Sequence, residues 1–292
     1  MFAQAYEIAR NFTWPVVIST RLYDGTVQSG CAAFVIVNDQ GWIVSVAHIA
    51  AANTAGQQDA GEISAFEAKV HAIESDAKLK PADKRGRIRR IKSNPKWVTN
   101  FSYWWGRDGL DIKDVKLLSE GDLFIGRLEP FDRSWVGRYP VFKNPSVLRP
   151  GTSLCKLGYP FHDIGATFDR KTGRFVLTPG SVPPPLFPIE GIYTRNALAG
   201  KSNDGKYDIV FLETSSPGLK GQSGGPIFDV KGTIWAIQSR TKHWPLGFSP
   251  KVKKNGREVE ENQFLNAGWG IHPQLLVSFM QDNGIAFLVS DY

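Results

Sequence analysis

Short apolar runs separated by turn residues fill the N-terminal part of the chain. After a short helical start at about 2–10, the sequence PVVISTRLYDGTVQSGCAAFVIVNDQGWIVSVAHIA is interrupted at Asp24-Gly25 and again from Asn38 to Gly41. Apolar runs bounded by Asp, Asn and Gly are typical of strands joined by hairpins. The pattern therefore predicts antiparallel β-structure from about residue 12.

The pattern changes between about 60 and 95. Ala, Glu and Lys recur there at helical spacing, Pro81 interrupts them, and a basic cluster extends from Lys84 to Lys92. Such spacing predicts helices. We therefore expect a helical insertion that hangs from a β-scaffold.

Strand patterns return after the insertion, in the ranges 122–128, 152–161, 208–214 and 224–239. The proline-rich segment 178–188 is expected to be a loop, because proline is excluded from central strands. The end of the chain predicts a strand followed by a helix that begins near Pro273 and ends at Asn283-Gly284. Many short strands with little regular strand-helix alternation indicate an all-β barrel or sandwich.

Composition agrees with one large globular domain or two packed halves. The chain has 292 residues, 42% of them hydrophobic, with a net charge of +7. This charge is compatible with an acidic partner but identifies none. The N-terminus lacks the apolar core of a signal peptide, and no run reaches the roughly 18 apolar residues of a membrane span. A soluble, cytoplasmic protein without a membrane partner is expected.

The segment LKGQSGGPIFD, residues 219–229, sets a lone serine, Ser223, among glycines. Gly221, Gly224 and Gly225 permit positive φ angles and close backbone approach, which would hold the hydroxyl on a sharp bend suited to a nucleophile. The G-x-S-x-G elbow of α/β-hydrolases needs a helix directly after the serine. Here the sequence PIFDVKGTIWAI predicts a hairpin, which weakens that interpretation.

The segment also contains G-x-S-G-G-P, which resembles the nucleophile motif of trypsin-like serine proteases. GWIVSVAHIA places His48 after an apolar strand, as in that family's histidine motif, and GDLFIGRL places Asp122 at the start of another. The three residues occur in the family's order. PGTSLCKLGYPF and AGWGIHPQLLVSFM look closest to the bacterial HtrA (Deg) branch. No residues follow 292 to form the PDZ domain usual in that branch, so a stand-alone peptidase domain is expected.

The resemblance implies an all-β fold of two six-stranded antiparallel β-barrels within a single trypsin-like peptidase domain, residues 1–292. The first barrel would span about 12–140 and carry the helical insertion at about 60–95. The second would span about 141–292 and include the C-terminal helix.

It also implies a Ser-His-Asp triad that hydrolyses peptide bonds through an acyl-enzyme. Ser223 would be the nucleophile, His48 the general base, and Asp122 the residue that orients the imidazole. The backbone N–H groups of Gly221 and Ser223 would form the oxyanion hole.

The same resemblance implies which residues bind the substrate. The primary pocket and the groove for the substrate strand would be lined by Pro217, Gly218, Gln238, Ser239, Arg240 and Thr241. A peptide would pair there as an added β-strand. Pro217 stands where trypsin has its pocket aspartate, so a preference for Lys or Arg is not supported. Gln222 replaces the aspartate that captures a new N-terminus, so zymogen activation by that route is not expected.

Alternatives remain open at this point. Asp111 and Asp114 are rivals of Asp122, which is preferred because only it directly leads an apolar strand. An esterase that uses Ser223 would need a downstream histidine such as His243 or His272. A catalytically silent pseudoprotease would use the cleft only to bind peptides.

Other features point to no further chemistry. The remaining histidines are scattered singly, and no P-loop or dinucleotide fingerprint occurs, so neither a metal nor a cofactor is expected. The basic stretch 84–92 and Trp104-Trp105 suit nucleic acid, but a solvated helix is the preferred interpretation and nucleic acid is not expected. The 60–95 insertion is a candidate docking element for a regulatory partner. The expected substrate is a protein or peptide, with a specific intracellular protein partner as the target.

Overall fold

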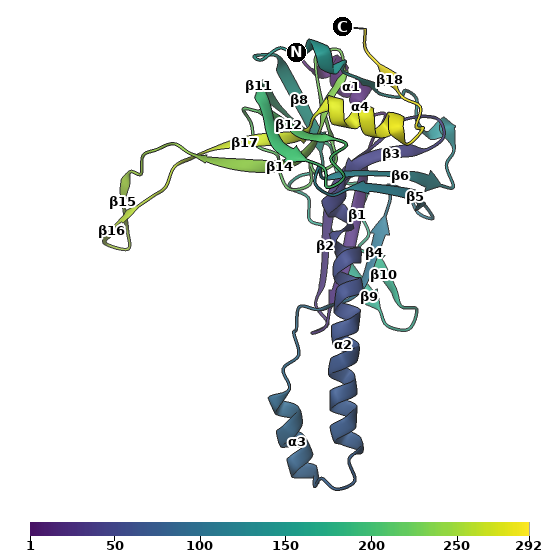
Figure 1. Ribbon diagram of the computed structural model, residues 1–292, viewed down its shortest axis with the longest axis vertical. Helices are drawn as coiled ribbons and strands as arrows, with labels where there is room; N and C mark the ends of the chain where they lie inside the picture. Colours follow the sequence, from purple (N-terminus) through teal and green to yellow (C-terminus); the bar gives the residue numbers. More distant parts are fainter. Residues whose placement is uncertain (292) are drawn as a thin grey trace.

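Two antiparallel sheets form the body of the protein in the computed structural model, which describes residues 1–291. After a short helix, α1 (Ala3–Ala9), the first sheet has the strand order β4-β1-β2-β3-β6-β5. Its strands are β1 (Thr13–Leu22), β2 (Val27–Ile36), β3 (Trp42–Val46), β4 (Val98–Trp104), β5 (Asp111–Leu118) and β6 (Leu123–Glu129). The sheet curls around a packed interior, with β4 and β5 at its two edges (Figure 1).

The second sheet closes on itself. Its strands follow the order β13-β8-β11-β12-β17-β14, and β13 also pairs with β14, which completes a six-stranded barrel. These strands are β8 (Ser153–Gly158), β11 (Phe187–Lys201), β12 (Asp208–Thr214), β13 (Pro226–Phe228), β14 (Ile234–Pro245) and β17 (Phe264–Ile271). Two short strands, β7 (Val141–Phe142) and β18 (Leu288–Val289), add parallel pairings beside β14.

One hydrophobic core runs through both halves. It includes Phe34 and Ile125 of the first sheet and Phe142 and Phe211 of the second. The helix α4 (Pro273–Asp282) contributes Leu276 to the same core. The predicted all-β architecture of two six-stranded units with a C-terminal helix is confirmed, and the shared core fixes the junction between the two units.

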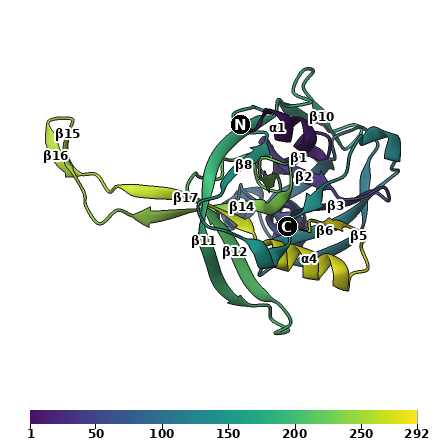
Figure 2. The ribbon, with the colours of Figure 1, turned by 90° about the horizontal axis from the view of Figure 1, so that it is seen from above.

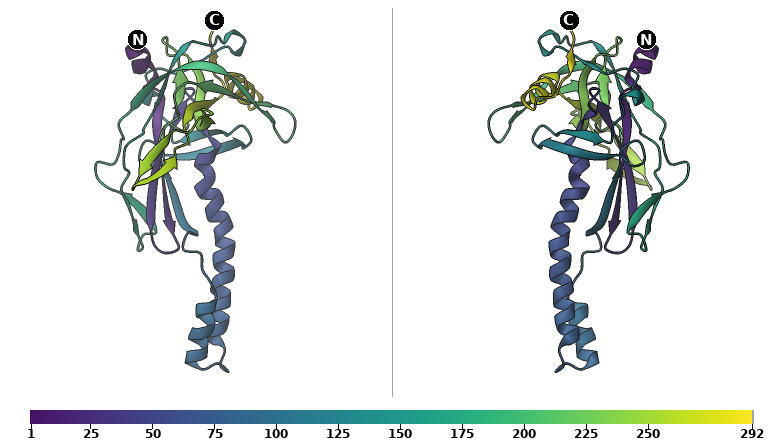
Figure 3. Two further views of the ribbon diagram at one scale, coloured as in Figure 1. Left: turned by 90° about the vertical axis from the view of Figure 1, so that its left-hand side faces the viewer. Right: turned by 90° about the vertical axis from the view of Figure 1, so that its right-hand side faces the viewer.

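A helical hairpin leaves the first sheet between β3 and β4. A 3₁₀ turn, η1 (Ala47–Ala50), leads into α2 (Ala51–Ser75), and α3 (Pro81–Arg90) follows. Figures 1 and 3 show α2 extending far beyond the sheets, with α3 beside its distal part. The insertion begins earlier than the residue near 60 expected from the sequence, because Asp59 and Glu62 accept hydrogen bonds from Val98 and Trp97 and hold this part of α2 against β4.

A β-ribbon leaves the second sheet on another side. Strands β14 and β17 continue past the barrel and lead to a hairpin of β15 (Lys251–Lys254) and β16 (Arg257–Glu260) (Figure 2). A further hairpin, β9 (Ala166–Asp169) with β10 (Arg174–Leu177), precedes the proline-rich segment, which is irregular until β11 begins. None of the helices within residues 1–291 is both long and apolar enough to cross a membrane.

Candidate active site

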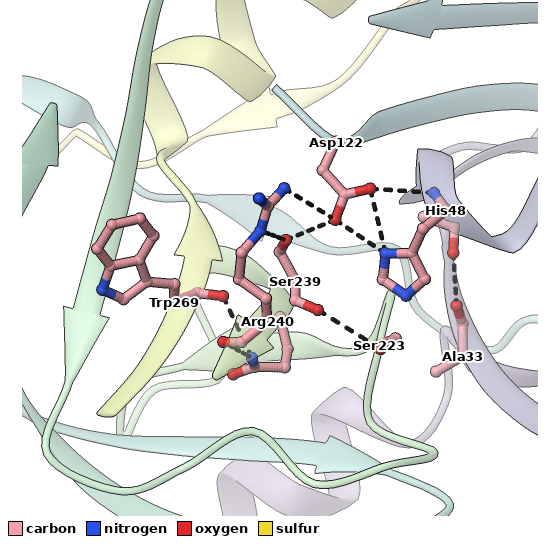
Figure 4. Close-up of polar contacts among 9 residues, drawn as sticks. Ala33, His48, Asp122, Ser223, Ser239, Arg240 and Trp269 are labelled. Carbon is pink, nitrogen blue, oxygen red and sulfur yellow. Dashed lines mark hydrogen bonds and ion pairs between the residues drawn. The ribbon is translucent and has the colours of Figure 1, made fainter. Parts of the chain in front are cut away.

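Three predicted side chains lie at the junction of the two sheets. His48 lies in η1 directly after β3, and Asp122 directly precedes β6. Because β3 and β6 are neighbours with Val46 opposite Leu123, the two residues end up side by side. Ser223 comes from the turn before β13 in the second sheet. Figure 4 shows all three in one place.

The His48 ring is held by the Asp122 carboxylate. His48 Nδ1 lies 2.9 Å from Asp122 Oδ2 and 3.1 Å from Oδ1. The backbone N–H of His48 donates to Oδ1 at 3.0 Å, which ties the main chain to the same carboxylate. The aspartate side chain is 6% exposed, whereas the imidazole is 48% exposed. With Nδ1–H facing the carboxylate, Nε2 is the nitrogen left to exchange protons with solvent or substrate.

Two side chains of β14 also contact Asp122, one through a hydrogen bond and one through an ion pair. Ser239 Oγ donates to Asp122 Oδ2 at 2.5 Å, and an Arg240 guanidinium nitrogen lies 3.6 Å from the same oxygen. Burial raises the pKa of the Asp122 carboxyl, but hydrogen bonds from His48 and Ser239 outweigh burial and hold that pKa below its usual value. The backbone of Asp122 has a φ of 53°, a left-handed conformation that is uncommon outside glycine. The carboxylate is therefore ionised at neutral pH and fixed in place.

The Ser223 turn is built from glycines. Gly221 has a φ of 96° and Gly224 a φ of 81°, which confirms the expected left-handed conformations at these two positions. A Cβ atom on either glycine would collide with a backbone carbonyl, that of Tyr159 or that of Ala33. Two hydrogen bonds anchor the turn: Ala33 N–H donates to Ser223 O at 2.7 Å, and Gly224 N–H donates to the carbonyl of Gln238 at 2.8 Å.

The Ser223 hydroxyl is half-buried and lies 3.5 Å from the carbonyl oxygen of Ser239. Within residues 1–291 it makes no hydrogen bond to the His48 ring. Catalytic hydrogen bonds are often long in unliganded enzymes and shorten when substrate is bound. Rotation of the hydroxyl away from Ser239 is therefore part of what any reaction here requires.

Two backbone donors accompany the hydroxyl. Gln222 N–H donates to Leu219 O at 2.9 Å, and the positive φ of Gly221 makes this a type II turn. In the part of the chain that the structure describes, the N–H groups of Gly221 and Ser223 donate to no protein acceptor. A cleft of about 280 Å³ adjoins Gly221 and includes Cys31 and Tyr159 in its lining. This arrangement suits an oxygen atom that becomes negatively charged next to Ser223.

The residues expected to line the pocket lie together. Thr241 Oγ1 donates to the carbonyl of Gly218 at 2.6 Å, and Gln238 Nε2 donates to the carbonyls of Arg240 and Trp269 at 3.0 and 3.2 Å. Ser239 directs its hydroxyl to Asp122 and its carbonyl oxygen to the Ser223 hydroxyl.

Lys156, which sequence reasoning missed, lies behind the pocket segment. Its ammonium donates to the carbonyl of Ser216 at 2.5 Å, to the hydroxyl of Ser216 at 2.8 Å and to the carbonyl of Pro217 at 2.9 Å. The side chain is 1% exposed, and burial lowers the pKa of Lys156 to about 7. The only signal in the sequence is a lysine inside the apolar strand TSLCKLGY.

The rival acidic residues and histidines lie elsewhere. Asp111 pairs with Lys113, and Asp114 pairs with Arg127, both on the exposed side of the first sheet. His243 Nδ1 forms a hydrogen bond with Asn266 Oδ1 on the β-ribbon. His272 accepts a hydrogen bond from Gln274 N–H at the start of α4, and burial lowers the pKa of this histidine to about 4. No group of three or more His, Cys, Asp or Glu side chains within residues 1–291 is arranged to hold a metal ion.

Comparison with known proteins gives structural similarity only. No protein-family model and no curated protein matches the sequence. The active form of the Rv3671c protease from M. tuberculosis is 10% identical with a TM-score of 0.48, and the match covers 98% of this chain and 86% of that one. The HtrA-type protease AlgW with a tripeptide is 14% identical with a TM-score of 0.47, and the match covers 97% and 63%. We therefore infer the activity from the geometry of the site.

Proposed function

We propose that this protein is a serine endopeptidase of the trypsin-like type. The observation that carries the proposal is the contact of His48 Nδ1 with the buried Asp122 carboxylate at 2.9 Å, beside a serine held on a glycine turn. A hydroxyl is a weak nucleophile at neutral pH, so a base held in one tautomer is what it needs. Asp122 is suited to hold the imidazole in that tautomer and to stabilise the imidazolium.

The reaction begins when Ser223 Oγ attacks a peptide carbonyl carbon. A C–O bond forms, the hydroxyl proton passes to His48 Nε2, and the carbonyl electron pair moves onto oxygen. The N–H groups of Gly221 and Ser223 then donate to this oxyanion, and each such donor contributes about 3 to 4 kcal/mol to lowering the barrier. The C–N bond breaks, the proton goes from His48 to the leaving amine, and water hydrolyses the acyl-enzyme by the same steps.

The substrate is a protein or peptide bound in extended form. Ser239 supports this assignment, because the pairing of β14 with β17 shifts register between Gln238 and Arg240. A bulge of this kind turns a residue out of the regular ladder. Once the Ser223 hydroxyl rotates away from it, the Ser239 carbonyl can accept a backbone N–H from a peptide that pairs with residues 239–241. A specific protein partner as the natural substrate remains part of the proposal.

The alternatives have less support. A pseudoprotease would account for the missing contact between Ser223 and His48, but it gives no reason for the carboxylate that orients the imidazole. An esterase with a downstream base would need His243 or His272, and each of these has another partner.

A serine-directed fluorophosphonate probe tests the proposal without knowledge of the substrate. We expect covalent labelling at Ser223, located by mass spectrometry. Labelling should be absent in Ser223→Ala and at least about 10⁴-fold slower in His48→Ala. The matched controls are His243→Ala and His272→Asn, which should label like the wild type. Folded wild-type protein that does not label, or labelling that depends on His243 or His272, would contradict the proposal.

A further inference from the structure

The inference concerns the residue that precedes the cleaved bond, and it rests on the proposed function. Consider a substrate whose carbonyl carbon lies next to Ser223 Oγ, with the carbonyl oxygen toward the Gly221 N–H. The residue before the cleaved bond then lies beside the Ser239 carbonyl. The side chain of that residue must then enter the space between two segments, 216–218 and 239–241. Contacts inside this space decide which side chains fit.

Gln238 fills the inner part of this space. Its side chain is 1% exposed, and its amide nitrogen is fixed by the carbonyls of Arg240 and Trp269. A Cβ atom built on Gly218 would lie 2.6 Å from Cδ of Gln238. The amide of Gln238 therefore lies against the backbone of Gly218, on the opposite wall.

The two walls are also tied together, so the space does not widen freely. Thr241 Oγ1 donates to the Gly218 carbonyl at 2.6 Å. From behind, the Lys156 ammonium donates to both Ser216 and the carbonyl of Pro217. A large side chain would have to displace a buried amide and break these bonds, and each bond broken leaves a buried polar group without a partner.

One polar atom in the pocket has no partner. Gln238 Oε1 is buried and accepts no hydrogen bond from any residue within 1–291. Solvent does not reach this oxygen either, so the Gln238 side chain leaves no space for a further group beside Gly218. We propose that Gln238, with the Thr241–Gly218 bond, restricts cleavage to bonds that follow Gly, Ala or Ser.

The test uses peptidyl diphenyl phosphonates that differ only in the first side chain, Ala or Phe, and react with the same nucleophile. We expect the Ala probe to label Ser223 of the wild type at least about tenfold faster than the Phe probe, a discrimination in the range that pocket fit supplies. Gln238→Ala should remove this discrimination. Gln238→Met, which keeps the volume and loses the amide, should retain it.

One further variant completes the test. Thr241→Val leaves Gln238 in place and breaks the hydrogen bond between the walls, so it should raise the Phe to Ala ratio even if Gln238→Ala does not fold.

The outcomes separate this inference from the proposed function. If folded wild type fails to react with the fluorophosphonate, the endopeptidase proposal fails and this inference with it. If the fluorophosphonate labels Ser223 but the Phe probe reacts as fast as the Ala probe, or neither reacts, only the pocket inference is overturned. The same holds if Gln238→Met gains Phe reactivity as Gln238→Ala does.

Discussion

The junction between the sheets and the helical hairpin are built in opposite ways. At the junction, Asp122, Gln238 and Ser239 are buried, and each makes side-chain hydrogen bonds. In the hairpin, no residue of α2 or α3 is buried. Yet α2 begins at Ala51, close to His48 in the chain. A segment next to a candidate catalytic residue in the sequence is therefore not necessarily held as firmly as that residue.

The hairpin itself has two parts. Near its root, Asp59 accepts from Val98 N–H at 2.6 Å and Glu62 accepts from Trp97 Nε1 at 2.7 Å. Phe66 completes this part with edge contacts to Tyr23 and Trp97. Residues 67–93 are then the distal part. We expect substitutions at the junction to have large effects on the reaction, and changes in the distal part to have small ones.

The largest effect should come from Asp122→Asn. An amide at this position turns a donor toward His48 Nδ1 and favours the wrong tautomer, so the probe-labelling rate should fall about 10⁴-fold. Asp114→Asn is the matched control, because Asp114 pairs with Arg127 and is remote from His48. Fast labelling of Asp122→Asn, or slow labelling of Asp114→Asn, would mean that Asp122 is not the residue that orients His48.

A smaller effect should follow removal of the charge beside Asp122. The Arg240 side chain is 45% exposed, so solvent screens its interaction with the carboxylate. In Arg240→Gln, Asp122 loses this ion pair but keeps the hydrogen bonds from His48 and Ser239. An exposed ion pair contributes at most about 1 kcal/mol, so the labelling rate should fall by no more than about fivefold.

Arg240→Lys keeps a positive charge and serves as the control for this change. Its labelling rate should stay close to that of the wild type. A loss of a hundredfold or more in Arg240→Gln would mean that the ion pair, and not the hydrogen bond from Ser239, holds Asp122 in place.

The sequence supports the prediction of the reactive residues because each lies in a local pattern. His48 follows an apolar strand, Asp122 leads another, and Ser223 lies in a glycine turn. The contacts around the site follow no such pattern, because they join segments that only the tertiary fold brings together. Ser239 and Asp122 are 117 residues apart, and Lys156 and Ser216 are 60 apart.

The sequence pattern also does not predict where β14 ends or where α2 begins. The strand expected to end at 239 continues to Pro245, because pairing with β17 extends it past the barrel. The helical insertion begins at Ala51 although Gly56 and Gly61 disfavour helix, because Asp59 and Glu62 bind the segment at the start of β4. Contacts between residues far apart in the sequence therefore decide both boundaries.

The smallest effect should come from removing the distal part of the hairpin. Residues 69–93 would be replaced by about six Gly and Ser residues, whose r.m.s. span is about 12 to 15 Å. This linker can close the chain because the rings of Phe66 and Trp97 lie 5.8 Å apart. The anchored part of α2 stays, so Tm should change by no more than about 2 °C, and labelling should stay within about twofold of the wild type.

Phe66→Ala is the contrasting variant, since it weakens the anchored part and should lower Tm more than the deletion does. If the deletion instead changes the labelling rate many-fold while Tm stays the same, the distal part acts on His48 through α2. That result would mean that a partner bound to residues 60–95 controls the reaction, because binding far along α2 would then alter the position of His48.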